Sequence, residues 1–432
     1  MKQNIAIYSN VSKKNGVRCF LSALYLSVVW LASQITIQGF EFDRIPFYLI
    51  FTVGMFFVLE FEAISYAVFM FLFLGAYELL KGVQPEFSYS LRGFLGILAL
   101  SCILSTCWFS LKAIHSYSYE QIGKWLRMVL LTILLSILID TVLGYFGITE
   151  TAYTNEFFLI PVYSGLSSEP SFLALVMAPY IFILCCDFSM FKKYIGRFSI
   201  FMMAAIVLLC PSATLFAECA TAGAITIIAH RVKSKGTFLI GIGLASLVVI
   251  LGWAIMSNPY FADRVFGVLS SDNMLLVDNS QFSALAFNKG REMAEYSILH
   301  FPFGVDFLDM RVLAPKVSIS FLSDWSYLYD FSSKDGASIL FKGICELGIL
   351  FIVFVFAAIL RFFREVFASH SGSFFGVVVI GFEFSFFCNF FRGASYFTGA
   401  IAIGVSALVF GLLHSQPQQN KAFIAPQNGS MT

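Results

Sequence analysis

One short segment combines residue types suited to acid–base chemistry. Residues 163–171 read YSGLSSEPS, and Glu169 stands directly before Pro170. Proline suits the first turn of a helix, so a helix is predicted to begin here, capped by Ser168 or Glu169. One interpretation is that the acid only favours the positive end of this helix. The other is a carboxylate available as a general base, and the residues alone leave both open.

A second group could bind phosphate. Six basic residues fall in the polar stretch 257–337: Arg264, Lys289, Arg291, Arg311, Lys316 and Lys334. Arginine binds phosphate through two parallel hydrogen bonds, so such a set suits a lipid diphosphate. The alternative is a solvated loop with surface ion pairs, such as Arg291 with Glu295 four residues later. Acids outnumber bases in this stretch, so it is not basic overall.

Ionisable residues also occur within apolar segments: Glu78, Asp140, Glu218, Lys342, Glu346 and Glu383, with Arg392 just beyond one. Charges inside a membrane are costly and usually face a cavity or a partner. Lys342 and Glu346 are four residues apart and suited to pair with each other. Because most of these residues fall in the outer halves of predicted helices, we expect a polar cavity open to the outside.

Composition identifies the element type that must position these groups. The chain of 432 residues is 59% hydrophobic and 12% charged, with mean hydropathy +0.83. Soluble domains are about 25% charged, so a soluble enzyme is excluded and an all-α polytopic membrane protein is predicted. The nine cysteines all fall in apolar runs, so we expect neither disulfides nor a thiolate metal site. The net charge of +1 gives no indication of nucleic-acid binding.

Apolar segments of roughly 20 residues are candidate membrane spans. Twelve are predicted: 19–37, 45–59, 63–80, 94–113, 125–148, 171–190, 198–212, 215–230, 237–256, 338–360, 374–391 and 398–413. The first is interpreted as a span and not as a removed signal. The stretch 198–230 could be one helix, but Pro211 interrupts it.

Loop charge predicts the orientation. Lys and Arg are concentrated on one side, as at Lys13, Lys14, Arg18, Lys192, Lys193, Arg197, Arg231, Lys233 and Lys235, whereas the short opposite loops hold Arg44, Lys81, Arg92 and Arg392. By the positive-inside rule the first side is cytoplasmic. The count favours splitting 198–230 into two spans and places both termini in the cytoplasm.

Two external segments interrupt the predicted transmembrane domain 1–413, namely 149–170 and 257–337. The larger is expected to be a largely helical external subdomain, because a structureless loop of that length is unusual. Within it, Ser283–His300 has a helical pattern, capped by Asp278 or Ser280 and ended by Pro302, and is suited to lie on the membrane surface. The tail 414–432 is polar and predicted to be a disordered cytoplasmic segment.

Three segments resemble the bacterial O-antigen polymerase (Wzy-type) and O-antigen ligase superfamily of membrane glycosyltransferases. Residues 164–171 (SGLSSEPS) are similar to a Gly…Glu-Pro-Ser segment of the polymerase branch. Residues 299–306 (LHFPFGVD) resemble a proline, aromatic, Gly-Val-Gly segment, with Asp306 replacing the second glycine. Residues 339–349 (ILFKGICELGI) resemble the helix after the large loop. No asparagine precedes that helix, which favours polymerase over ligase.

The resemblance implies a GT-C-like fold in the bacterial inner membrane and a glycosyltransferase that joins oligosaccharide repeat units carried on undecaprenyl diphosphate. It implies Glu169 as catalytic base, with Arg264 and Arg291 stabilising the leaving diphosphate. The substrate-binding residues expected with them are Ser168, Ser171, Lys289, His300, Asp306, Arg311 and Arg392. No cofactor or metal is expected. The expected partners are membrane lipid and a chain-length regulator protein, and nucleic acid is not among them.

Three other functions also fit the sequence. An O-antigen ligase is the nearest enzyme alternative. A lipid-linked oligosaccharide flippase also suits twelve helices with intramembrane charges, although the large external segment and the lack of a two-half repeat weigh against it. A membrane scaffold without chemistry is the third class.

Overall fold

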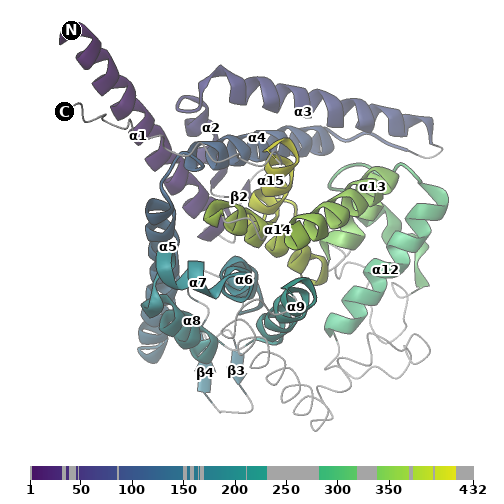
Figure 1. Cartoon of the computed structure of the whole chain (residues 1–432). Coiled ribbons are helices and arrows are strands. Elements are labelled where there is room, and N and C mark those ends of the chain that lie inside the picture. Colours follow the sequence, from purple (N-terminus) through teal and green to yellow (C-terminus); the bar gives the residue numbers. More distant parts are fainter. Residues whose placement is uncertain are drawn as a thin grey trace, which may run out of the picture.

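The structure is a computed structural model, and it describes residues 2–31, 36–37, 45–46, 48–84, 87–148, 153–155, 160–163, 165, 170–210, 212–230, 282–318, 338–368, 373–392 and 395–414. These residues are almost entirely helical (Figure 1). The helices are α1 (Lys2–Leu31), α2 (Tyr48–Phe56), α3 (Glu60–Leu80), α4 (Leu91–Ile114), α5 (Tyr119–Tyr145), α6 (Pro170–Cys186), α7 (Phe188–Met190), α8 (Arg197–Leu209), α9 (Ala213–His230), α12 (Phe282–His300), α13 (Ile339–Ala368), α14 (Phe374–Arg392) and α15 (Gly399–His414).

Short helical turns and strands complete the described elements. The turns are η1 (Lys81–Val83), η2 (Phe191–Ile195) and η5 (Met310–Lys316). Two short antiparallel pairs join β1 (Thr36–Ile37) to β2 (Ile45–Pro46) and β3 (Tyr153–Asn155) to β4 (Ile160–Val162). The second pair lies within the external segment 149–170, where the sequence predicts no strands.

Each predicted apolar segment contains a helix, except 237–256, which lies outside the described residues. The stretch 198–230 is two helices, because α8 ends at Leu209 and α9 begins at Ala213. The helix predicted over Ser283–His300 is α12, which begins one residue earlier.

Several helices are suited by length and composition to cross a membrane, so the prediction of a helical membrane protein is supported. Among the described residues, four helical stretches are long and apolar enough, and a fifth is added if one bent pair counts as a single span. The four are Glu62–Val83, Leu91–Ile114, Tyr119–Tyr145 and Ile339–Phe367. The bent pair, 172–186 with 188–195, turns by 109°.

Capping residues fix where some helices begin. Ser118 and Gln121 form a reciprocal capping box at the start of α5. The side chain of Ser90 accepts a hydrogen bond from the backbone N–H of Gly93, which caps α4. These two caps fix the first residues of α4 and α5 independently of hydrophobic packing.

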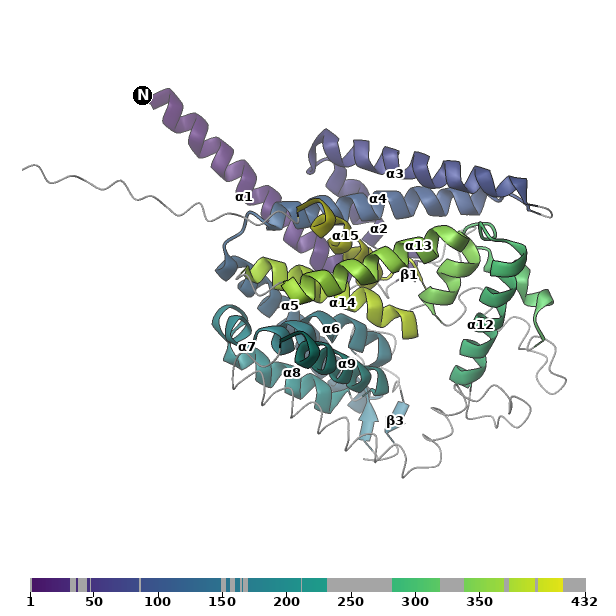
Figure 2. The same cartoon turned by 45° about the vertical axis from the view of Figure 1, so that its right-hand side comes forward.

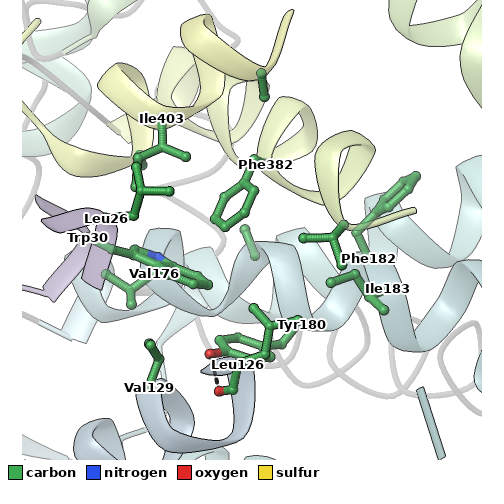
Figure 3. Close-up of a cluster of buried hydrophobic side chains, with 14 of the residues drawn as sticks. Leu26, Trp30, Leu126, Val129, Val176, Tyr180, Phe182, Ile183, Phe382 and Ile403 are labelled. Atoms are coloured by element: carbon green, nitrogen blue, oxygen red, sulfur yellow. Dashed lines mark hydrogen bonds between the residues drawn. The ribbon is translucent and has the colours of Figure 1, made fainter. Parts of the chain in front are cut away.

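The helices pack around α14, which contacts α6, α15 and α13, while α3 runs beside α4 (Figures 1 and 2). The core between α1, α6 and α14 is aromatic (Figure 3). The Trp30 ring stacks on Tyr180 at 5.3 Å and meets the Phe382 ring edge-on at 4.8 Å. The Tyr180 hydroxyl donates to the Leu126 carbonyl at 2.7 Å, which brings α5 into the same core.

Helix ends gather at two opposite ends of this bundle. At one end the His115 ring contacts Phe375 at 4.9 Å and Phe410 at 5.9 Å, which joins the last residues of α4 and α15 to the start of α14. Tyr194 of η2 and Phe374 meet there too, at 4.8 Å. The charge of the loops predicts that all of these helix ends lie on one side of the membrane, and in the structure they lie together.

Candidate functional site

The structure describes only some of the predicted site residues. Ser168, Glu169 and Arg264 lie outside the described residues. Ser171 is the second residue of α6, as the predicted helix start at Pro170 requires, and Arg392 is the last residue of α14. The others, Lys289, Arg291, His300, Asp306 and Arg311, lie on α12 or in the residues that follow it.

Three of the predicted residues belong to α12. Arg291 pairs with Glu295 at 3.6 Å, which confirms the i,i+4 ion pair suggested by the sequence. His300 stacks on the Tyr296 ring at 4.0 Å. Lys289 is fully buried, so its ammonium group is not presented on the surface of the described residues.

Asp306 lies where the large loop returns to the bundle. It is only 4% exposed, and the Ser90 hydroxyl and backbone N–H both donate to its carboxylate. Burial raises the pKa of Asp306 to about 6, with the hydrogen bonds from Ser90 lowering it and the neighbouring Glu78 carboxyl raising it. Asp306 therefore holds the loop against the first residues of α4.

Lys81 is the centre of the same contact region. Its ammonium group donates to the Glu78 carboxylate at 2.6 Å, the Val305 carbonyl at 2.7 Å and the Glu346 carbonyl at 2.6 Å. The side chains of Lys81 and Glu78 are both 0% exposed. An ammonium group has three donors, so all three are used, and the other oxygen of Glu78 accepts from the Phe307 N–H at 3.0 Å.

A break in α13 leaves backbone carbonyl groups without helical partners, and donors from other elements bind to them. Gly348 has φ 51° and ψ −132°, which interrupts the helix. Carbonyls freed by the break accept hydrogen bonds from outside the helix: Cys345 from the Val305 N–H, Glu346 from Lys81 and Leu347 from the Tyr77 hydroxyl. A non-helical backbone within a membrane requires such substitutes.

The turn after α12 fits into this break. The Ile349 N–H donates to the Pro302 carbonyl at 2.9 Å. Gln84 extends the contact, because its amide donates to the Gly304 carbonyl at 2.9 Å and accepts from the Phe303 N–H at 3.0 Å. Gly304 has φ 84°, and a Cβ there would lie 2.5 Å from the Glu346 carbonyl oxygen, so this close approach needs glycine.

A second ion pair extends the region toward α15. Lys342 and Glu346 pair at 3.7 Å, as their spacing predicts. The Tyr396 hydroxyl faces Glu346, and the Tyr396 ring stacks on Phe307 at 4.9 Å. Glu78, Lys81, Asp306, Lys342 and Glu346 are hereafter called the loop-anchor cluster.

The loop-anchor cluster is suited to positioning rather than to catalysis. Its charges are buried, and Lys81, Glu78 and Asp306 are hydrogen-bonded to one another's groups, to backbone or to Ser90, while Glu346 is compensated by the Lys342 charge at 3.7 Å. It fixes the segment that carries α12, with Arg291 and His300, and η5, with Arg311, to one end of the bundle.

The start of α6, which follows the predicted external segment 149–170, lies at the same end of the bundle. The Ser385 hydroxyl of α14 donates to the Leu175 carbonyl of α6 at 2.9 Å, and Gly381 packs against Pro179, so the two helices are antiparallel. The start of α6 therefore lies beside the end of α14. The start of α13 is there as well, because the Ser338 hydroxyl donates to the Phe390 carbonyl.

The remaining intramembrane charges do not join the loop-anchor cluster. Arg361 pairs with Glu383 at 2.7 Å, and Asp140 accepts from the Gly165 N–H at 2.9 Å. Glu218 lies beside the Cys388 thiol. The sequence predicts one polar cavity, whereas these groups have separate partners in the described part of the chain.

Sequence reasoning missed several residues that the structure brings together, namely Lys81, Gln84, Ser90 and Tyr396. The i,i+3 spacing of Glu78 and Lys81 was a usable signal. Nothing in the sequence marks Tyr396.

Within the described ranges, no three His, Cys, Asp or Glu side chains are arranged to hold a metal ion.

Comparison with protein families, curated proteins and solved structures gives no match to this chain. The family resemblance therefore stays a prediction based on its three motif segments.

Proposed function

We propose that the chain is a surface-polysaccharide polymerase of the bacterial inner membrane. In this proposal about twelve spans form a GT-C-like transmembrane domain with both termini in the cytoplasm. The substrates are oligosaccharide repeat units on undecaprenyl diphosphate, and transfer occurs at the periplasmic face. A chain-length regulator protein is the proposed partner.

One structural observation carries the proposal. The start of α6, directly after the Glu-Pro motif, lies at the bundle end where the loop-anchor cluster holds α12 and η5. A transfer site built from two external segments requires both to reach the same end of the bundle.

The proposed chemistry uses a carboxylate and guanidinium groups. The acceptor hydroxyl loses its proton to Glu169 while its oxygen bonds to the anomeric carbon of the donor sugar. The bond from that carbon to the diphosphate oxygen breaks, and the electron pair leaves with the lipid diphosphate. Arg264 and Arg291 stabilise the charge that develops on this leaving group.

The topology rests on the two sets of helix ends. The ends of α4 and α15 meet the start of α14, and the end of α14 meets the start of α13. This arrangement is the one required if successive spans alternate in direction. The side rich in Lys and Arg is then cytoplasmic by the positive-inside rule.

Deletion of the gene tests the function. Cells without the protein should make surface glycan with single repeat units instead of a ladder of chain lengths, and the wild-type gene supplied in trans should restore the ladder. An unchanged ladder in the deletion strain would refute the proposal. An O-antigen ligase would instead leave free lipid-linked polymer, with no glycan on the lipid A core.

A flippase is the second candidate, and the buried Arg361–Glu383 pair favours it, because intramembrane charges are frequent in transport pathways. Loss of a flippase would leave lipid-linked repeat units on the cytoplasmic face of the membrane. Loss of a polymerase would leave single units already exported. Labelling the lipid-linked sugar from each side of sealed vesicles distinguishes the two.

A further inference from the structure

Glu218 is an acidic side chain enclosed in the helical bundle. It lies on α9, is 3% exposed, and neither carboxyl oxygen is accessible to solvent. Neither oxygen has a hydrogen-bond partner among the described residues. No ion pair of the described part of the chain includes it, in contrast to the buried Glu78, Glu346 and Glu383, which all have cationic partners.

The surroundings of Glu218 are apolar or weakly polar. Leu215, Cys219 and Ala222 of the same helix belong to the main hydrophobic core. The Cys388 thiol of α14 lies beside the carboxyl group, and Cys185 of α6 is near Cys219. Thiols are weak hydrogen-bond donors and carry no charge when protonated, so they do not replace hydration water around a carboxylate.

Helix α13 also packs against α9, and its buried basic residues form ion pairs with acids other than Glu218. On α13, Lys342 pairs with Glu346 and Arg361 pairs with Glu383. An ionised carboxylate without a partner in a water-free interior is strongly unfavourable, and such groups take up a proton instead. Burying the neutral acid costs less free energy, because it carries no charge and its O–H group can donate a hydrogen bond.

We propose that Glu218 is a proton-binding site within the bundle, occupied at neutral pH. The proton leaves only when α9 and α14 separate at Cys388, or when water or a cation enters between them. Ionisation of this group is therefore linked to a change in helix packing. The proposal is independent of the glycosyl-transfer proposal, because it uses none of the same residues.

Infrared spectroscopy of the full-length protein in lipid vesicles tests the proton directly. A protonated carboxyl group gives a carbonyl stretch separate from that of an ionised one. The difference spectrum, wild type minus Glu218→Gln, should contain this band at pH 7 and pH 8. The matched control is Glu120→Gln on the exposed face of α5, which should leave the band unchanged. A wild-type spectrum in which Glu218→Gln removes only an ionised-carboxylate band would overturn the proposal.

Chemical labelling provides a second test if Glu218→Gln does not fold. A lipid-soluble carbodiimide reacts with a protonated carboxyl group: the acid O–H adds across one C=N bond, and the acyl group then migrates to nitrogen. All atoms of the reagent are retained, so the peptide containing Glu218 gains the reagent's full mass. We expect this adduct from the wild-type protein in vesicles at pH 8, and its absence there would overturn the proposal.

Discussion

The ammonium group of Lys81 donates to the backbone carbonyl of Glu346 at 2.6 Å, although the two residues are far apart in the sequence. This bond joins the end of α3 to the broken helix α13. The same ammonium group also reaches Val305, so the large loop is fixed at the point where both helices meet. The Lys81 ammonium group thus replaces one of the helical hydrogen bonds lost at the break in α13.

Replacement of Lys81 by methionine is expected to destabilise the protein strongly. It leaves the Glu78 carboxylate buried without its partner, and breaking a buried pair costs about 3–5 kcal/mol. Thermal unfolding in lipid nanodiscs measures the effect. The double variant Lys81→Met/Glu78→Gln should lose less stability than Lys81→Met, because no uncompensated charge remains.

The control for this experiment is the exposed pair Lys112–Glu62, at 3.4 Å. Lys112→Met should cost only about 0–1 kcal/mol, as exposed ion pairs do. Equal melting temperatures for the Lys81 and Lys112 variants would contradict the anchoring role of Lys81.

Asp306 should make stability depend on pH. Burial is the main reason that its pKa is about 6 in the folded protein, whereas the ordinary pKa of an aspartate side chain is 3.8. Since the folded state holds the proton more tightly, the contribution of Asp306 is complete below pH 3.8 and is lost as the pH rises to about 6. The difference in melting temperature between Asp306→Asn and wild type should therefore change across this range and be constant above it.

A matched variant tests whether this pH effect belongs to Asp306. Glu295 is exposed on α12 and lies outside the loop-anchor cluster. Glu295→Gln should reproduce the wild-type dependence on pH from 4 to 7. A flat difference curve for Asp306→Asn over that range would argue against a buried, proton-binding carboxyl group at this position.

Gly348 should not tolerate a side chain. Its φ of 51° disfavours other residues, and a Cβ would lie 2.2 Å from the Pro302 carbonyl oxygen. Strain of this kind costs about 1–3 kcal/mol, so Gly348→Ala should lower the melting temperature. Gly75→Ala in α3 is the control, because its Cβ meets nothing within 4 Å and alanine improves helix propensity by about 0.5–1 kcal/mol. A Gly348→Ala variant as stable as wild type would show that the break is not essential.

The sequence predicts the helices well because length and hydropathy determine them locally. The helix α3 begins three residues before the expected span 63–80 and ends at its last residue, and α12 begins one residue before the expected amphipathic helix. The start of α6 at Pro170 follows from proline chemistry. These features depend on neighbours in sequence.

The loop-anchor cluster could not be predicted in the same way. Lys81 and Arg361 look like loop cations when charges are counted along the chain, but both are buried against acids. The partners of Lys81 at Val305 and Glu346 are backbone carbonyls, which no side-chain pattern marks. The mean hydropathy of α13 likewise gives no sign of the break at Gly348, because hydropathy depends on residue type and not on backbone angles.

Glu169 and Arg264 provide the most direct test of the proposed chemistry. Glu169→Ala removes the proposed base and Arg264→Ala the proposed stabilising cation, so each should abolish chain extension while the protein remains in the membrane at wild-type amounts. The glycan ladder on a gel reports extension, and immunoblotting of membranes reports the amount of protein. Glu120→Ala and Arg197→Ala, at the starts of α5 and α8, are matched controls that should leave the ladder intact. Because positioning by the loop-anchor cluster is separate from the proposed proton transfer, Glu169→Ala should also keep the wild-type melting temperature. Normal ladders in both the Glu169 and Arg264 variants would remove the proposed site while leaving the fold unchanged.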